Sequence, residues 1–301
     1  SADCTDVSGT TVTFSTDCSD LDIAGDGSNV TINSGVTINK TGGGALGLRN
    51  STNTTITNNG TISATGNYGM RNTLNSTISN LTNNGTISAD VSLGLRNGIG
   101  TTITILTNTG TISAVGEYGL HNKSGTIGTI TITNSGTISA GTNYGLHNFD
   151  SSSTITTITN SGTISASGHN GLRNKGVITT ITNTKTGIIS AGTNYGLYND
   201  TSGKIKTLSN SGTISAGTNY AIVNTGSIDT FTNTGFITIP TGNTGISNQG
   251  SITTFNNLQG KLDSNPVTFI KSLPTNYNVI VNNTDDYGQI EFSSFSGQTN
   301  T

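Results

Sequence analysis

The sequence predicts an all-β protein, a parallel β-helix of about ten 25-residue coils with three strands in each coil and a cap at each end. Three observations predict this fold. One short unit repeats along most of the 301 residues, and each unit holds three strand-sized apolar segments separated by Gly and Asn. Only 30% of the residues are hydrophobic and 9% are charged, against about 45–50% and 25% in ordinary globular domains. The chain therefore has too few apolar residues for one thick core.

The repeat is clearest in the pentapeptide Gly-Thr-Ile-Ser-Ala. Successive copies follow at steps of 23 to 26 residues and cover roughly residues 30 to 260. A fixed period of this length is typical of solenoids, in which stacking buries the apolar side chains that a single coil leaves exposed. The pentapeptide and its variants begin at ten glycines: Gly35, Gly60, Gly85, Gly110, Gly136, Gly162, Gly187, Gly212, Gly235 and Gly260.

Each unit has three apolar segments. The first reads Ile-x-x-Ile/Leu/Phe-x-Asn, the second is the pentapeptide, and the third reads Tyr/Leu-Gly-Leu-x-Asn. They are too short for helices and rich in Ile and Thr, so we expect strands, each paired with its equivalent about 4.8 Å away in the next coil. The Asn that ends the first segment predicts an internal ladder of amides: Asn33, Asn58, Asn83, Asn108, Asn134, Asn160, Asn183, Asn210, Asn233 and Asn257.

Two rival solenoids do not fit. The calcium-binding nonapeptide roll needs an Asp in every turn, and the acidic residues between 35 and 260 are few and scattered. Leucine-rich repeats need a helical segment after the strand, which the units lack. The ends depart from the repeat consensus. We therefore divide the chain into an N-terminal cap at 1–30, the repeats at 31–265, and 266–301 as a C-terminal cap or the start of a junction.

The two cysteines, Cys4 and Cys18, lie close together in the N-terminal cap. An even pair at one terminus predicts one local disulfide and an oxidising compartment, the alternative being two free thiols. The chain opens at Ser1, as expected of a mature N-terminus after removal of a leader.

Charge excludes several classes of function. Twelve basic residues and a formal net charge of −3 cannot form a broad phosphate-tracking surface, so we expect no nucleic-acid partner. No apolar run is long enough to span a bilayer. The acidic residues gather near the ends, and no nucleophile elbow, metal-spaced His pair or phosphate loop is present. We therefore expect no enzyme, no cofactor and no metal site. Asp285 and Asp286, the one adjacent acidic pair, sit in an expected turn.

The candidate binding residues form one column. All four arginines occupy the position between the Leu or Met and the Asn of the third segment, and two of the three histidines and a tyrosine continue the series. Strand alternation points this column outward, beside a flat track of glycines. Arg forks suit carboxylate or sulfate, so we predict an anionic-glycan site that binds more strongly near pH 5.5 as the histidines charge. The alternative is a solvated cover of long side chains. The candidates are Arg49, Arg71, Arg96, His121, His147, Arg173 and Tyr198.

Neutral hydroxyl side chains suggest two further roles. Ladders of Thr, Ser and Asn carry little charge to repel a second copy, so rods can associate side by side. The pentapeptide also presents Thr and Ser on either side of an inward Ile, as in Thr61 and Ser63, a regular array expected of an ice binder. Ile188 and Phe236 interrupt that array. The alternatives are solvent-facing strand residues and a structural stalk without a binding role.

The iterated unit that runs from Thr133 to Asn148 resembles the passenger domains of bacterial autotransporters, the type V secreted proteins, over about 230 of the 301 residues. The strand-like ending from Tyr277 to Phe292 resembles the region before the translocator barrel. The resemblance implies a right-handed β-helix exported across the outer membrane, at the cell surface or released. It implies a virulence-associated adhesin that attaches to host cells or glycans, or self-associates in autoaggregation and biofilm. Membrane attachment would come only through a translocator barrel that lies outside this sequence.

Overall fold

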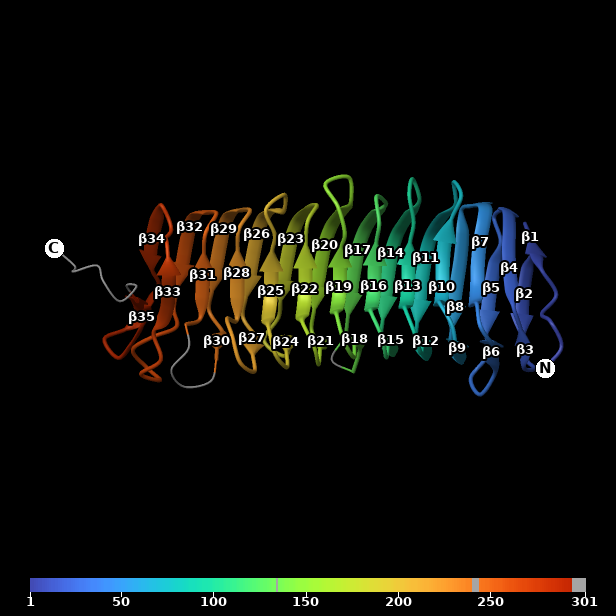
Figure 1. Ribbon diagram of the computed structural model, residues 1–301, viewed down its shortest axis with the longest axis horizontal. Coiled ribbons are helices and arrows are strands. Elements are labelled where there is room, and N and C mark those ends of the chain that lie inside the picture. Colours follow the sequence, from blue (N-terminus) through green and yellow to red (C-terminus); the bar gives the residue numbers. More distant parts are fainter. Residues whose placement is uncertain (134, 240–243, 294–301) are drawn as a thin grey trace.

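The computed structural model describes residues 1–133, 135–239 and 244–293. Every regular element in these ranges is a strand, and nearly all of the strands stack into three long parallel sheets that form a rod, with β1 near one tip and β37 near the other (Figure 1). We name the sheets A, B and C. From β1 to β32 the chain visits them in the order B, C, A, so that strands three apart in sequence are paired; beyond β30 the described strands of the rod add only to sheets B and C. The predicted fold class, a parallel β-helix of three-strand coils, is confirmed.

Sheet B, which faces the viewer in Figure 1, has thirteen strands. They are β1 (Val7–Ser8), β4 (Leu21–Asp26), β7 (Gly44–Thr52), β10 (Tyr68–Thr73), β13 (Leu93–Asn97), β16 (Tyr118–Asn122), β19 (Tyr144–Asn148), β22 (Asn170–Asn174), β25 (Tyr195–Asn199), β28 (Ile222–Asn224), β31 (Ile246–Asn248), β33 (Val267–Lys271) and β37 (Ile290–Phe292). The segment Tyr/Leu-Gly-Leu-x-Asn of the repeat forms this sheet.

Sheet C has twelve strands and sheet A has ten. Sheet C, from the segment Ile-x-x-Ile-x-Asn, has β2 (Thr11–Phe14), β5 (Asn29–Ile32), β8 (Thr54–Asn58), β11 (Thr77–Asn83), β14 (Thr102–Asn108), β17 (Thr126–Ile132), β20 (Thr154–Asn160), β23 (Val177–Asn183), β26 (Lys204–Asn210), β29 (Ser227–Asn233), β32 (Ser251–Asn257) and β34 (Asn276–Val279). Sheet A, from the pentapeptide, has β3 (Cys18–Ser19), β6 (Thr37–Lys40), β9 (Thr61–Ala64), β12 (Thr86–Ala89), β15 (Thr111–Ala114), β18 (Thr137–Ala140), β21 (Thr163–Ala166), β24 (Ile188–Ala191), β27 (Thr213–Ala216) and β30 (Phe236–Thr238).

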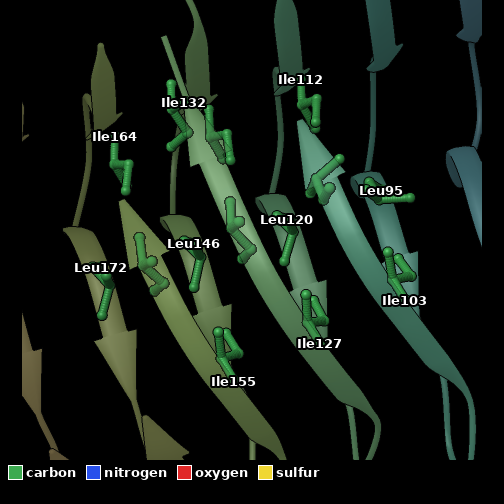
Figure 2. Packing of buried hydrophobic residues seen from close by; sticks show 14 of the residues in the cluster. Leu95, Ile103, Ile112, Leu120, Ile127, Ile132, Leu146, Ile155, Ile164 and Leu172 are labelled. Atoms are coloured by element: carbon green, nitrogen blue, oxygen red, sulfur yellow. The ribbon is translucent and has the colours of Figure 1, made fainter. Parts of the chain in front are cut away.

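The core is a set of stacked aliphatic columns along the rod axis. In sheet B, Leu95 pairs with Leu120, and Leu120 with Leu146. In sheet C, Ile103 pairs with Ile127 in the same way. All five side chains are fully buried, and Figure 2 shows these columns side by side. Each coil thus contributes only a few apolar side chains, which explains how a chain with 30% hydrophobic residues holds a continuous core.

Buried asparagines form two ladders rather than the one predicted. In sheet B the Nδ2 of each Asn donates to the Oδ1 of the next along an unbroken run: Asn72, Asn97, Asn122, Asn148, Asn174, Asn199, Asn224 and Asn248. In sheet C the ladder has two runs: Asn58 to Asn108 by way of Asn83, and Asn160 to Asn257 by way of Asn183, Asn210 and Asn233. These ladders satisfy amides that would otherwise be buried without partners.

The sheet C ladder corrects the predicted list in two coils. Ile32, not Asn33, pairs with Asn58. Ile132 lies between Asn108 and Asn160 and separates the two runs, and Asn134 lies outside the described residues. At both places the registry keeps an isoleucine in the interior, fully buried, because burial of an apolar side chain contributes more than a net hydrogen bond.

The ends of the rod are built from the same sheets as its middle. A disulfide joins Cys4 to Cys18, with their Cα atoms 5.0 Å apart, and Cys18 continues the column of inward isoleucines through Ile38. At the other end β34 extends sheet C, β37 extends sheet B, and β35 (Val281–Asn283) pairs antiparallel with β36 (Asp286–Tyr287). Of the adjacent pair predicted in a turn, Asp285 lies in the turn that joins this hairpin and Asp286 begins β36. The boundaries at 30 and 265 stay predictions.

Candidate binding face on sheet B

The outer side of sheet B carries two columns of large side chains. One runs through the first residue of each third segment and holds Tyr68, Leu93, Tyr118 and Tyr144 in successive coils. The other runs through the position before the ladder Asn: Arg71, Arg96, His121, His147, Arg173 and Tyr198. Five of the eight tyrosines lie on strands of this sheet. The face therefore combines cations with aromatic rings.

Arg49 does not belong to the column, contrary to the sequence prediction. Gly47, not Arg49, pairs with Arg71, and Arg49 pairs with Thr73 two residues further along. This registry places Leu46 between Leu21 and Met70 in the core column. Either registry would bury a leucine, but the observed one also buries Leu48 at the position that the ladder asparagines take in later coils.

Arg71 and Arg96 both lie close to the ring of Tyr68. Their guanidinium carbons lie 5.7 and 5.8 Å from its centroid, which is cation–π distance. Arg96 also donates from Nη1 to the Tyr68 hydroxyl at 3.1 Å. Within the described residues, neither arginine has an ion pair. Their positive charges are therefore held in place but not neutralised.

Arg173 is neutralised by contrast. Its Nη2 donates to Oδ2 of Asp200 at 2.6 Å and its Nε to the same oxygen at 3.2 Å. Its guanidinium lies 5.1 and 5.2 Å from the rings of Tyr144 and Tyr198, and Nη1 also donates to the Tyr144 hydroxyl. Burial would raise the pKa of Asp200, but the hydrogen bonds from Arg173 and from the Thr201 amide and the Arg173 charge hold that pKa below its usual value. Arg173 is thus committed to the protein itself.

The histidines correct the sequence prediction most strongly. His121 is 5% exposed and His147 is 2% exposed, because rings of Tyr118, Tyr144 and Phe149 pack over them at centroid distances of 4.7 to 5.2 Å. Burial, and to a smaller extent the nearby cations, lowers the pKa of His121 to about 3. Burial, and to a smaller extent the charges of His121, Arg173 and Lys175, lowers the pKa of His147 to about 2. Both rings are therefore neutral near pH 5.5 and supply no charge to a ligand there.

The glycines beside the column do not form an outward floor. A Cβ on Gly69 would lie 2.7 Å from the carbonyl oxygen of Ser88, and one on Gly94 would lie 2.6 Å from that of Ser113. Both atoms belong to strands of sheet A, so these glycines let two sheets approach closely at a corner. Gly47 differs, because its Cβ would meet only Asp22 and Arg71 side-chain atoms at 3.4 Å or more.

Carboxylates border the basic end of the face. Asp20 forms an ion pair with Lys40. Asp22 is the strand partner of Gly47 and lies near Arg49 and Arg71. Burial, and then repulsion from Asp20 and Asp6, raises the pKa of the Asp22 carboxyl despite those arginines. Lys40, Arg49 and Arg71 therefore share this end of the face with several aspartates, and of these three cations Lys40 has an ion pair.

The other two faces carry few charges and are rich in hydroxyl groups. On sheet A the predicted Thr and Ser columns are in register and half-buried, and Ile188 and Phe236 interrupt the Thr column, with exposed fractions of 41% and 49%. The sequence analysis missed a second array, on sheet C. There Thr-x-Thr pairs face outward in four of five successive strands: Thr129 with Thr131, Thr157 with Thr159, Thr180 with Thr182, and Thr230 with Thr232.

The described part of the chain holds neither a candidate metal site nor a membrane-spanning helix. No group of three or more His, Cys, Asp or Glu side chains there could hold a metal ion, and no helix there is long and apolar enough to cross a membrane. Comparison with protein-family models, curated proteins and solved structures gives no match. The resemblance to autotransporter passengers therefore stays a prediction from the repeat.

Proposed function

We propose that this chain is a non-enzymatic adhesive rod displayed on a bacterial surface, and that it binds anionic glycans of host cells with the outer face of sheet B. One observation carries the proposal: a single face of the rod collects every arginine and most of the tyrosines, while the faces of sheets A and C present mainly Thr, Ser and Asn. Arginine forks bind carboxylate and sulfate, and tyrosine rings stack on sugars.

The basic end of the face is the binding region. Arg71 and Arg96 have no carboxylate partner among the described residues, whereas Arg173 is paired with Asp200. The site therefore comprises Arg49, Arg71 and Arg96 with Tyr68, and it excludes His147, Arg173 and Tyr198 of the predicted column. Export to the surface, as the resemblance implies, agrees with a disulfide in the first coil.

A matched pair of double variants tests the proposal. Arg71→Ser with Arg96→Ser removes two charges from sheet B. Lys204→Ser with Lys206→Ser removes two charges from the exposed side of β26 on sheet C. We expect the first variant to lose salt-sensitive binding to surfaces coated with carboxylated or sulfated glycosaminoglycan and the second to keep it. Equal binding by both variants, with the same circular dichroism spectrum, would refute the proposal.

Ice binding is the second candidate, and the Thr pairs of sheet C favour it. Successive hydroxyls along a column lie about 4.8 Å apart and the two columns about 6.6 Å apart, as strand geometry requires. Such a regular field of hydroxyl and methyl groups can order water. Thermal hysteresis that is lost in Thr157→Lys, at the middle of the array, would support this function, and absence of hysteresis in the native chain would exclude it.

A further inference from the structure

Two hollows interrupt the outer face of sheet B at its basic end. The first has a volume of about 600 Å³ and is lined by Asp22, Gly44, Gly47, Arg49, Tyr68 and Arg71 among others. The second, of about 290 Å³, is lined by Tyr68, Leu93, Arg96, Glu117, Tyr118 and His121 among others. Tyr68 borders both, so the hollows are neighbours along the rod axis.

The repeat explains why the hollows occur at these coils. In the tyrosine column Gly44 pairs with Tyr68, and Leu93 separates Tyr68 from Tyr118. In the arginine column Gly47 pairs with Arg71. A smaller side chain therefore stands where neighbouring coils have tyrosine or arginine, namely glycine at β7 and leucine at β13. The two coils are two steps apart, about 10 Å.

The second hollow contains polar groups that lack partners. The Nε of Arg96 and the Nδ1 of His121 are buried and make no hydrogen bond, and His121 is only 5% exposed. A buried polar atom without a partner is costly, and native proteins rarely leave one unsatisfied. Both atoms are covered by neighbouring side chains, so a ligand hydroxyl in the hollow bonds to them only when those side chains shift.

We propose that the two hollows are adjacent subsites for a carboxylated oligosaccharide in which an acidic sugar alternates with a neutral one. This inference rests on the proposed function and specifies its ligand. The sugar carboxylate lies in the first hollow against Arg49 and Arg71, the ring between the hollows stacks on Tyr68, and hydroxyls of the neutral sugar bond Arg96 Nε and His121 Nδ1.

Charge at the site favours a sparsely charged ligand. Asp20 and Asp22 line the first hollow and Glu117 lines the second, so each hollow holds carboxylate as well as cationic groups. Like charges repel at short range, and a polymer with sulfate on every sugar would place anions against the carboxylates of both hollows. The carboxylates can instead accept hydrogen bonds from neutral hydroxyls.

The test measures the affinity of the full chain for a hyaluronan hexasaccharide by calorimetry, beside a heparin hexasaccharide. Gly47→Thr narrows the first hollow, and the nearest neighbours of an added Cβ at Gly47 would be side-chain atoms of Asp22 and Arg71 at 3.4 Å or more. We expect at least a tenfold loss with Gly47→Thr and no change with Ser139→Thr, which adds a methyl group on sheet A. His121→Phe removes Nδ1 but keeps a ring, and we expect a several-fold loss. His147→Phe is the control for His121→Phe, because His147 lines neither hollow.

The outcomes separate the two proposals. Unchanged affinity in Gly47→Thr and His121→Phe, together with loss in Arg71→Ser with Arg96→Ser, would overturn the subsites and keep the anionic-glycan face. Unchanged affinity in all of these variants would overturn both. Tighter binding of heparin than of hyaluronan to the native chain would contradict the preference for a sparsely charged ligand.

Discussion

The two halves of the sheet B face use the same repeat position in opposite ways. Arg71 and Arg96 keep their charge available, whereas Arg173 is bound by Asp200. Asp200 directly follows Asn199, the ladder asparagine of the coil after the one that holds Arg173. The equivalent residue for Arg71 is Gly98, and for Arg96 it is Lys123. One corner residue therefore decides whether an arginine on this face can meet a ligand or is part of the fold.

The histidines between the two halves give the largest expected effect. The unfolded pKa of histidine is near 6.5, and the folded values are about 3 and about 2 for His121 and His147. The unfolded chain therefore binds protons that the folded chain does not. Above pH 6.5 the histidines do not reduce the free energy of unfolding. As pH decreases from 6.5 toward 3, the free energy of unfolding falls by up to about 1.4 kcal/mol per pH unit for each histidine.

Thermal unfolding between pH 7 and pH 4 measures this loss. The double variant His121→Phe with His147→Phe keeps the aromatic packing and removes the titrating groups, so its melting temperature should depend less on pH than that of the native chain. The same pH dependence in both proteins would show that the histidines are protonated in the folded state.

The disulfide should stabilise only the basic half. Cys4 and Cys18 are 14 residues apart, and closure of such a loop contributes about 3 kcal/mol in the chain-entropy model. Because a solenoid is stabilised mainly by neighbouring coils, Cys4→Ser with Cys18→Ser should raise hydrogen exchange in β1 to β7 and leave β19 to β25 unchanged. A uniform rise along the rod would contradict this local effect.

The ion pair should stabilise the other half. Asp200→Asn leaves the Arg173 guanidinium, whose side chain is 24% exposed, without its counter-charge. Hydrogen bonds to charged groups contribute about 1.5–3 kcal/mol, so we expect a loss of about 2 kcal/mol in the free energy of unfolding. Asp22→Asn is the control in the basic half, where no ion pair is broken among the described residues, and it should change stability little. Equal losses would contradict the assigned difference.

The smallest effect is expected from a variant that gives the basic half a corner carboxylate like that of the other half. Lys123→Asp places a carboxylate where Asp200 stands relative to Arg173, and we expect it to pair with Arg96. Affinity for a carboxylated glycan should then fall about tenfold, which is about 1.4 kcal/mol. Lys123→Ser separates this pairing from simple loss of a charge and should weaken binding less. If the two variants bind equally, the corner residue does not control Arg96.

The repeat made the fold predictable, but not the registry, burial or charge pairing of each site residue. The spacing of Ile, Gly and Asn fixes three strands per coil, and local pattern is enough for that. The registry at β7 was hidden because residues 47–50, Gly-Leu-Arg-Asn, match the consensus, while the inner column instead takes Leu46. The burial of His147 depends on Phe149 and on Tyr118 from a neighbouring coil. Contacts between coils such as these cannot be read from alternation within a single strand.

Hydrogen exchange in the presence of a hyaluronan hexasaccharide tests the central claim, that the basic half of sheet B is the ligand face. β7, β10 and β13, in the blue to cyan part of Figure 1, carry the three arginines of the proposed site. The structure predicts added protection in these strands and in the corners at Asn67, which lines both hollows, and at Lys123, with none in β19, β22 or β25. Protection on sheets A or C, or around Arg173, would contradict the claim.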